Sequence, residues 1–323
     1  MKVHRSIQSF HEQSISNPVI TFGSFDGVHL GHISILKQMH EIAENVSGQT
    51  VVTTFHPHPR KVIYPMDKSM KLLTTIDEKI ELFRKSGIDH LVIIPFSIEF
   101  SQMLPEEYIE SFIIRHYRPH SIIIGYDHRF GLNRAGDINT LKKFSVEGNY
   151  EVIEIEQKRI DSLKISSTAI RKALIQSDIE KANKLLGYRY QIRGKVIHGE
   201  KVGKKIGFRT ANIEINDPDK LIPGEGIYAA LVQYGNLQYK GMMYIGTKPT
   251  LRPEGELSVE VHLFDFNMDV YSEEIVVEFI DFIRKDATFD SLQELTDHMQ
   301  SDKEKALKIL ENVGTTEKFH FKT

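Results

Sequence analysis

The sequence predicts two folded units, an α/β unit with a parallel sheet followed by an antiparallel β-barrel or sandwich. Short β-branched runs alternate with amphipathic stretches through the first part of the chain, which is typical of strand–helix alternation. Later segments instead alternate apolar and polar residues, with Gly or Pro between most of them. The length of 323 residues also suits two domains of roughly 150 residues each.

In the first unit the predicted strands are nearly all apolar, which favours a parallel sheet covered by helices on both faces. These strands are Val19–Gly23, Thr50–Phe55, His90–Pro95, Ser121–Gly125 and Glu151–Ile155. The predicted helices are Gly31–Asn45, Ile76–Ser86, Pro105–Tyr117 and Asp137–Glu147. Such sheets bind ligands beyond the carboxyl ends of their strands. We therefore expect Gly23–Gly31, Phe55–Arg60 and Gly125–Gly136 at one rim.

A helical segment from Ser167 to Leu186, with Gly187 as its C-cap, leads into the second unit. The predicted strands there are Tyr190–His198, Gly226–Tyr234, Gln238–Ile245, Ser258–Phe264 and Glu274–Ile283, before a last helix over Ser291–Glu311. Within Ser258–Phe264 apolar and polar residues alternate, as in the antiparallel strands of a barrel or sandwich. We place the boundary near residue 187, which gives domains 1–186 and 187–323.

Composition excludes several classes of protein. The chain has 41 basic and 44 acidic residues, a net charge of −3 and no cysteine. No overall basic field draws it to nucleic acid or to an anionic membrane, and it has no disulfide or thiolate site. Apolar runs such as Leu91–Pro95 are far shorter than the ~20 residues of a membrane span. We expect a cytoplasmic protein with small-molecule substrates and no nucleic-acid or membrane partner; the sequence carries no signal for the oligomeric state.

The segment Thr21–His32, TFGSFDGVHLGH, is the strongest local feature. A strand ends in a glycine-containing loop and enters a helix, so backbone N–H groups and the positive helix end form a phosphate site. His29 and His32 are three residues apart and can face the same way, and Gly31 lets a nucleotide approach the backbone. Imidazoles can donate hydrogen bonds to phosphoryl oxygens as negative charge develops.

This segment resembles the His-x-Gly-His motif of the Rossmann-like nucleotidylyltransferase superfamily, whose members join a nucleotide to an acceptor phosphate and release pyrophosphate. Three further segments narrow the resemblance: Phe55–Pro59 (FHPHP), Ile124–Gly131 (IGYDHRFG) and Ile165–Arg171 (ISSTAIR). Together with Phe25–His29 they resemble the FMN adenylyltransferase module of the prokaryotic FAD synthetases, the bifunctional riboflavin kinase/FMN adenylyltransferase family. The resemblance covers essentially the whole chain.

The resemblance implies in-line attack by the FMN phosphate on the α-phosphorus of ATP, with Mg²⁺ and the side chains of His29, His32 and Arg171 offsetting the developing charge. It implies nucleotide contacts for Gly23, Phe25, Asp26, Gly27, Gly31, Asp127, Arg129, Ser167 and Thr168. It implies flavin contacts for Phe55, His56, Pro57 and His58.

Several of these residues also have plain structural interpretations. Ser167 and Thr168 can form a helix N-cap, and His56 and His58 can be rigid loop residues. Asp127 can cap a turn, or it can orient the nucleotide or Arg129. His128 stands where the family usually has Phe, which concerns the detail of nucleotide or flavin contact.

The second unit resembles the riboflavin kinase module, a small β-barrel. The matching segments are His198–Gly203, Gly207–Ile213, Pro223–Tyr228, Gly246–Thr250, Val259–Phe266 and Phe282–Arg284. The resemblance implies that Thr210 and Asn212 hold Mg²⁺ and ATP phosphates. It also implies that Glu260 is the base for the riboflavin 5′-hydroxyl. Gly203, Lys204 and Gly207 would form the ATP phosphate loop.

Four departures from the kinase pattern predict weak or absent kinase activity. Arg209 replaces the motif proline and is expected to loosen the loop that aims Thr210 and Asn212. Lys204 replaces an arginine, Ser272 a glycine, and Asp286 a glutamate. We therefore predict an FAD synthase with a lapsed kinase barrel. The alternatives are a fully bifunctional enzyme that also takes riboflavin, another adenylyl or cytidylyl transferase, and a non-catalytic flavin-binding regulator.

Overall fold

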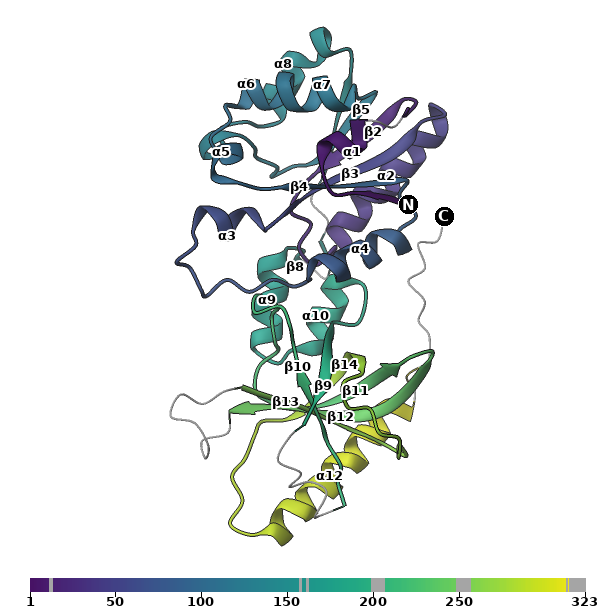
Figure 1. Ribbon diagram of the computed structural model, residues 1–323, viewed down its shortest axis with the longest axis vertical. Coiled ribbons are helices and arrows are strands. Elements are labelled where there is room, and N and C mark those ends of the chain that lie inside the picture. The colour runs from purple at the N-terminus through teal and green to yellow at the C-terminus, as the bar shows by residue number, and fades with distance from the viewer. Residues whose placement is uncertain are drawn as a thin grey trace. The chain divides into compact units, whose positions relative to one another are not determined.

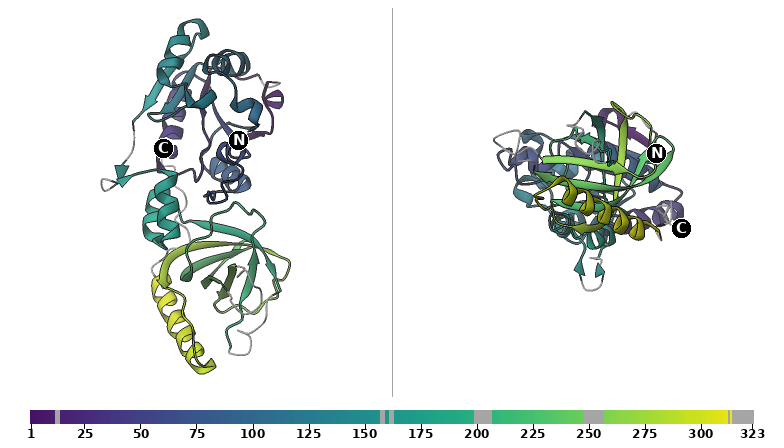
Figure 2. Two further views of the ribbon diagram at one scale, coloured as in Figure 1. Left: turned by 90° about the vertical axis from the view of Figure 1, so that its left-hand side faces the viewer. Right: turned by 90° about the horizontal axis from the view of Figure 1, so that it is seen from below.

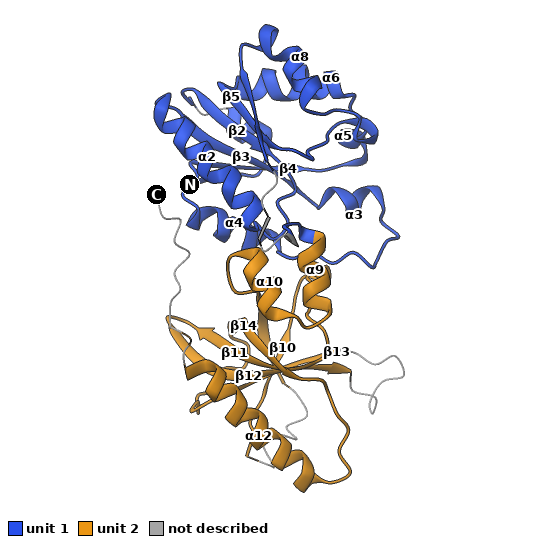
Figure 3. Cartoon of the chain, turned by 180° about the vertical axis from the view of Figure 1, so that it is seen from behind, with its two compact units in different colours: residues 1–167, 321–323 blue, residues 168–320 orange. Residues whose placement is uncertain are grey.

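The computed structural model describes residues 1–11, 14–156, 159–160, 163–198, 207–247, 257–311 and 313. The chain forms two compact units, one of residues 1–167 with 321–323 and one of residues 168–320 (Figure 3). The elements of both are labelled in Figure 1.

The first unit is built on a six-stranded parallel sheet with the order β1-β4-β3-β2-β5-β6. Its strands are β1 (Lys2–His4), β2 (Pro18–Phe22), β3 (Gln49–His56), β4 (His90–Pro95), β5 (Ser121–Gly125) and β6 (Glu151–Ile155). The predicted parallel sheet and its predicted strands are confirmed. Only the short edge strand β1 was not expected.

Helices cover both faces of this sheet, as predicted. The helices of this unit are α1 (Ile7–His11), α2 (Leu30–Asn45), α3 (Pro59–Ile63), α4 (Ile76–Lys85), α5 (Ile98–Ser101), α6 (Pro105–Glu107), α7 (Arg115–Tyr117) and α8 (Ile138–Gly148). Helix α2 packs against β2, β3 and β5. An aromatic-rich core on the other face includes Phe10, Phe22, Tyr108, Phe112 and Tyr117. The predicted helix 105–117 contains a π-helical stretch, η1 (Tyr108–Ile114), and a 3₁₀ turn, η2, spans Leu132–Arg134.

The strand order creates a switch point next to β2. The chain proceeds from β2 through β3 and β4 toward one edge, and then returns to place β5 and β6 on the other side of β2. In open α/β sheets the crevice beyond the carboxyl ends at such a point is the usual ligand site. The loops after β2 and β5 both begin at this crevice, so the two predicted rim segments 23–31 and 125–136 belong to it.

The second unit is a closed barrel with the strand order β10-β13-β12-β11-β14-β9. Its strands are β9 (Gln191–Ile197), β10 (Ala211–Glu214), β11 (Gly226–Tyr234), β12 (Leu237–Thr247), β13 (Leu257–Leu263) and β14 (Glu274–Arg284). The barrel alternative is therefore right and the sandwich is wrong; β10 was not predicted. Helix α12 (Leu292–Glu311) packs against β11, β12 and β14 (Figure 2).

The segment between sheet and barrel holds the short strands β7 (Arg159–Ile160) and β8 (Leu163–Lys164), followed by helices α9 (Ser167–Ile175) and α10 (Ile179–Leu186). Gly187 ends α10 with φ +82°, the predicted C-cap. The turn between the two helices and helix α10 both bond to the barrel: the Tyr228 hydroxyl donates to Ser177 Oγ over 2.9 Å, and Asn183 Nδ2 donates to the Phe279 carbonyl over 2.9 Å. The predicted domain boundary near residue 187 remains a prediction, and these helices lie within the second compact unit apart from Ser167.

Candidate active sites

The loop after β2 turns sharply before it enters α2. Phe25, Gly27 and Val28 have φ values of +46°, +83° and +36°. His29 then occupies the N-cap position with extended backbone, and its side chain does not cap the helix. The first N–H groups of α2 therefore point toward the crevice at the positive end of a 16-residue helix, the arrangement that binds phosphate.

The imidazole rings of His29 and His32 are stacked, with ring centroids 3.7 Å apart and planes inclined by 12°. A Cβ on Gly31 would come within 3.2 Å of the His29 ring, so glycine makes room for this ring as well as for a ligand. Burial lowers the pKa of His32 well below 6.5, helped by the charges of His29 and Lys79. His32 is therefore neutral at neutral pH. Within the described residues, its buried Nδ1 has no hydrogen-bond partner.

Asp26 is buried and serves to fix this loop. Its carboxylate accepts hydrogen bonds from the backbone N–H groups of Leu73, at 2.9 Å, and Thr74, at 3.2 Å. The Gly27 N–H donates to the Thr74 hydroxyl over 3.1 Å. These contacts of Asp26 are structural, and its expected nucleotide contact remains a prediction. Gly23 lies at the start of the loop, where its N–H donates to the Thr53 carbonyl over 3.1 Å.

Ser167 is the first residue of α9, and its hydroxyl donates to the Asp26 carbonyl oxygen over 2.9 Å. This contact ties the start of α9 to the β2–α2 loop. Thr168 and Arg171 follow on α9 and belong to the second compact unit. The phosphate contacts expected of these residues remain predictions.

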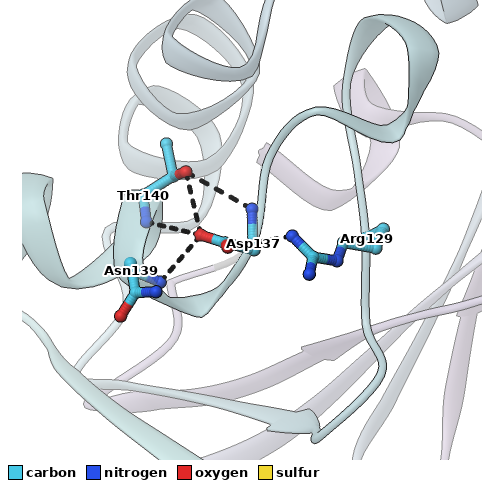
Figure 4. Close-up of polar contacts among 4 residues, drawn as sticks. All are labelled: Arg129, Asp137, Asn139 and Thr140. Atoms are coloured by element: carbon cyan, nitrogen blue, oxygen red, sulfur yellow. Dashed lines mark hydrogen bonds and ion pairs between the residues drawn. The ribbon is translucent and has the colours of Figure 1, made fainter.

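In the loop after β5, the guanidinium of Arg129 is paired with Asp137 instead of Asp127 (Figure 4). The two groups are 2.8 Å apart, and Asp137 also caps α8 by accepting from the N–H groups of Asn139 and Thr140. This pair holds the loop to α8. Asp127 is exposed. Burial and the charge of Arg134 lower the pKa of the neighbouring His128 to about 4, and the Asp127 carboxylate offsets part of this shift.

The predicted flavin segment spans the last two residues of β3, Phe55 and His56, and the two that follow. The Phe55 ring contacts Phe96 and Phe100, with centroids 5.6 and 5.8 Å away. The peptide bond between His56 and Pro57 is cis. His58 Nδ1 accepts from the Arg60 N–H and so caps α3, which is a structural role. A contact of this segment with flavin remains a prediction.

The barrel brings the predicted kinase residues together. The Thr210 hydroxyl donates to Glu260 over 2.9 Å, and Asn212 is directly opposite Glu260 in the β10–β13 pairing. Ser258, which the sequence did not single out, donates its hydroxyl to the other Glu260 oxygen over 2.9 Å. Hydroxyl, amide and carboxylate oxygens are hard ligands of the kind that Mg²⁺ prefers. The side chains of Thr210 and Asn212, with the Glu260 carboxylate beside them, therefore fit this ion.

The predicted loosening of the loop at Arg209 remains a prediction, and the structure shows one contact that opposes it. His262 Nδ1 donates to the Arg209 carbonyl oxygen over 2.7 Å, and β10 begins two residues later. The contact of His262 therefore holds the Arg209 carbonyl just before the strand pairing of β10 begins at Ala211. Ser272 has φ +67°. Glycine adopts this backbone conformation without strain, which explains why the family usually has glycine at this position. Asp286 accepts a hydrogen bond from the Tyr244 hydroxyl over 3.0 Å.

The predicted phosphate loop lies only partly within the described residues. Gly203 and Lys204 lie outside them. Gly207 has φ +83° with open space around its Cα, as expected for a glycine loop. No cluster of His, Cys, Asp or Glu suited to a metal occurs among the residues that the structure describes. In the same part of the chain, no helix has the length and apolar character needed to cross a membrane.

A protein from Listeria monocytogenes named bifunctional riboflavin kinase/FMN adenylyltransferase is 36% identical over 288 residues, which span 89% of this chain and 91% of the relative. This chain belongs to that family. The family model for FAD synthetase matches residues 11–169, and the model for riboflavin kinase matches residues 186–310. A Bacillus subtilis protein of the same name is 36% identical over 91% of this chain and 93% of its own length.

A solved structure from Streptococcus pneumoniae, titled as a macrolide-efflux protein, covers 95% of this chain and 98% of its own, with a TM-score of 0.86 and 28% identity. The relatives bear names for both activities and match over both units. The prediction that kinase activity is weak or absent is therefore not supported. The alternative prediction, a fully bifunctional enzyme, fits these relatives better.

Proposed function

We propose that the chain is a cytoplasmic bifunctional enzyme that phosphorylates riboflavin to FMN and then transfers AMP from ATP to FMN, giving FAD and pyrophosphate. In this proposal residues 1–186 act as the adenylyltransferase and residues 187–323 as the kinase. The observation that carries it is the stacked pair His29 and His32, placed at the switch point of the sheet and at the N-terminus of α2. The family and the names of its relatives agree with this proposal.

In the adenylyl transfer, an oxygen of the FMN phosphate attacks the α-phosphorus of ATP. A new P–O bond forms, the bond to the β-phosphate oxygen breaks, and pyrophosphate leaves. The attacking phosphate is already ionised, so no general base is needed. The α2 N–H groups and the imidazoles of His29 and His32 donate hydrogen bonds to the phosphoryl oxygens as charge develops, and Arg171 balances the leaving pyrophosphate.

In the kinase step, the riboflavin 5′-hydroxyl attacks the γ-phosphorus of ATP and ADP leaves. A hydroxyl must lose its proton, and Glu260 accepts it. Each carboxylate oxygen has two lone pairs, so Glu260 can accept this proton while it holds Thr210 and Ser258. Mg²⁺ held by Thr210 and Asn212 would neutralise charge on the ATP phosphates when bound.

One flavin assay tests both steps. The protein is incubated with ATP and Mg²⁺ and with either FMN or riboflavin, and the products are separated by chromatography. We expect FAD from FMN, and FMN followed by FAD from riboflavin. FAD from FMN without any product from riboflavin would restore the lapsed-kinase prediction. No product from either flavin would overturn the proposal in favour of a binding protein.

A further inference from the structure

Lys79 is a buried lysine next to the β2–α2 loop, and neither the sequence motifs nor the proposed mechanism uses it. It belongs to α4, and its side chain is only 5% exposed. Its ammonium donates to the Ser24 carbonyl oxygen over 2.6 Å. Ser24 lies at the start of the loop that leads to His29. Lys79 therefore bonds to the backbone that positions the histidine pair.

Lys79 is one of several residues that contact the β2–α2 loop. The Thr54 hydroxyl also donates to the Ser24 carbonyl, over 3.2 Å. The Phe25 ring, one residue further on, lies edge-on to His32 with centroids 5.0 Å apart, and contacts Phe83 of α4 at 5.5 Å. Since Lys79 and Phe83 lie one helical turn apart, one face of α4 supports both the loop backbone and the ring that packs against His32.

A lysine in this place is costly for the fold. Burying an ammonium group is unfavourable unless it is well paired, and Lys79 lies near the positive N-terminal end of α4. An apolar residue would fill the space without desolvating a charge. The Asp26 carboxylate offsets part of the cost, yet burial still lowers the pKa of Lys79 to about 8. The stability of the fold alone therefore does not explain a charged residue at position 79.

We propose that Lys79 is a positioning residue of the adenylyltransferase site, whose ammonium fixes the Ser24 carbonyl and thereby sets the loop that presents His29 and His32. This inference rests on the proposed adenylyl transfer. The positive charge also favours the neutral form of His32, whose pKa it lowers. The charged and titratable groups that interact with the ammonium are Asp26 on the loop and His32 on α2, and Glu78 is its neighbour in sequence on α4.

The test compares Lys79→Gln, Lys79→Arg and, as a matched control, Lys85→Gln at an exposed position of the same helix. We expect Lys79→Gln to lower kcat for FAD formation from FMN at pH 7 by at least about tenfold, because small misplacements of reacting groups are expensive. Riboflavin phosphorylation and the thermal unfolding midpoint of the first unit should change little. Lys85→Gln should behave like the wild type.

The pH profile separates a positioning charge from a merely structural side chain. Adenylylation by the wild type should decline above about pH 8 as Lys79 loses its proton, and the decline should move to higher pH in Lys79→Arg. An unchanged kcat in Lys79→Gln, or an alkaline decline that this variant retains, would overturn the inference. So would a loss of activity that merely follows the unfolded fraction.

A second readout does not depend on catalysis. The ring nitrogens of His32 can be titrated by NMR in the wild type, Lys79→Gln and Lys85→Gln. Removing the Lys79 charge should raise the pKa of His32, and removing that of Lys85 should not. If the wild type makes no FAD, the proposed function fails; if the His32 titration is the same in all three proteins, the inference fails independently.

Discussion

Arg284 at the end of β14 forms a two-pronged ion pair with Asp302 of α12. Arg284 Nε and Nη2 donate to the carboxylate over 3.0 and 2.8 Å, and the Asp302 side chain is only 2% exposed. The guanidinium also lies over the Phe289 ring, with 5.7 Å between its central carbon and the ring centroid. This pair attaches the last helix to the barrel.

Replacing Asp302 by Ala should destabilise the barrel unit by about 3 kcal/mol, because it leaves a partly buried guanidinium without its partner. Denaturant unfolding monitored on the purified chain measures this loss. The exposed pair Arg193–Glu274 is the control, because its side chains are 40% and 60% exposed. Glu274→Ala should cost less than about 1 kcal/mol. Equal losses of unfolding free energy in the two variants would show that the buried Asp302 pair stabilises the barrel no more than an exposed ion pair does.

Replacing His32 by Ala should reduce FAD formation from FMN by about 100-fold or more, since it removes one hydrogen-bond donor to the reacting phosphate. Riboflavin phosphorylation should be unchanged. The low pKa of His32 also means that adenylylation should show no inflection near pH 6.5 from this residue. Activity assays over pH 5.5–8 check both points. An equal loss of both activities would instead indicate a folding defect.

Glu260→Gln should lower riboflavin phosphorylation by a factor of about 100 or more while FMN adenylylation persists. Glutamine can still accept a hydrogen bond from Thr210, so the barrel should remain folded. Ser258→Ala is the companion variant, because it removes one Glu260 contact without touching the base. Kinase activity that survives in Glu260→Gln would exclude the base role.

Acid should weaken the first unit through the buried pair His4 and His90. His4 Nδ1 donates to the Ser9 carbonyl, so its Nε2 accepts from His90 Nδ1 over 3.0 Å. Burial lowers the pKa of His90 to about 4, against an ordinary value of 6.5. The unfolded chain therefore binds more protons between these values, and stability is full above about pH 6.5 and declines toward pH 4.

We expect this decline to be about 2 kcal/mol and to be smaller in His90→Gln, which cannot titrate. Denaturant unfolding at pH 7, 5.5 and 4.5 measures both slopes. Replacing His298, which is exposed on α12, by Gln provides the control. The same pH slope in all three proteins would assign the acid sensitivity to other groups.

Ser272→Gly should stabilise the barrel by about 1 kcal/mol, because Ser272 has φ +67°, a conformation that side chains other than glycine adopt at a cost. The reverse change at Gly235, which has φ +58° and open space around it, should destabilise by a similar amount. Thermal unfolding of the two variants tests the pair. A loss of stability in Ser272→Gly would mean that its side chain contributes more than the backbone strain costs.

The buried strands were predictable from the sequence because short apolar segments such as Ser121–Gly125 are typical of parallel strands that are covered on both faces. Sequence reasoning missed β1 and β10, which have only three and four residues. It also missed the π-helical stretch within 105–117, which is a rare variant of the α-helix without a sequence signal of its own. The departures at Arg209 and Ser272 were visible in the sequence, but the contact of His262 that holds Arg209 was not.

The candidate sites show the same division between local and distant contacts. The spacing of His29 and His32 placed both rings at one helix end, so their proximity was predictable. Lys79 and Ser258 gave no local signal, because each acts through a residue far along the chain or across a strand pairing. The pairing of Arg129 with Asp137 was likewise hidden, since either acidic residue lay within reach.

Closure of the barrel has a consequence for self-association. A ring of paired strands offers no unpaired backbone to another chain, whereas an open sheet offers two edges. In the first unit these edges are β1 and β6. β6 has exposed acidic side chains at Glu151 and Glu154, and β1 is only three residues long with an exposed Lys2. The charges on β6 and the short length of β1 thus disfavour pairing between the sheet edges of two copies of this protein, and so disfavour aggregation through them.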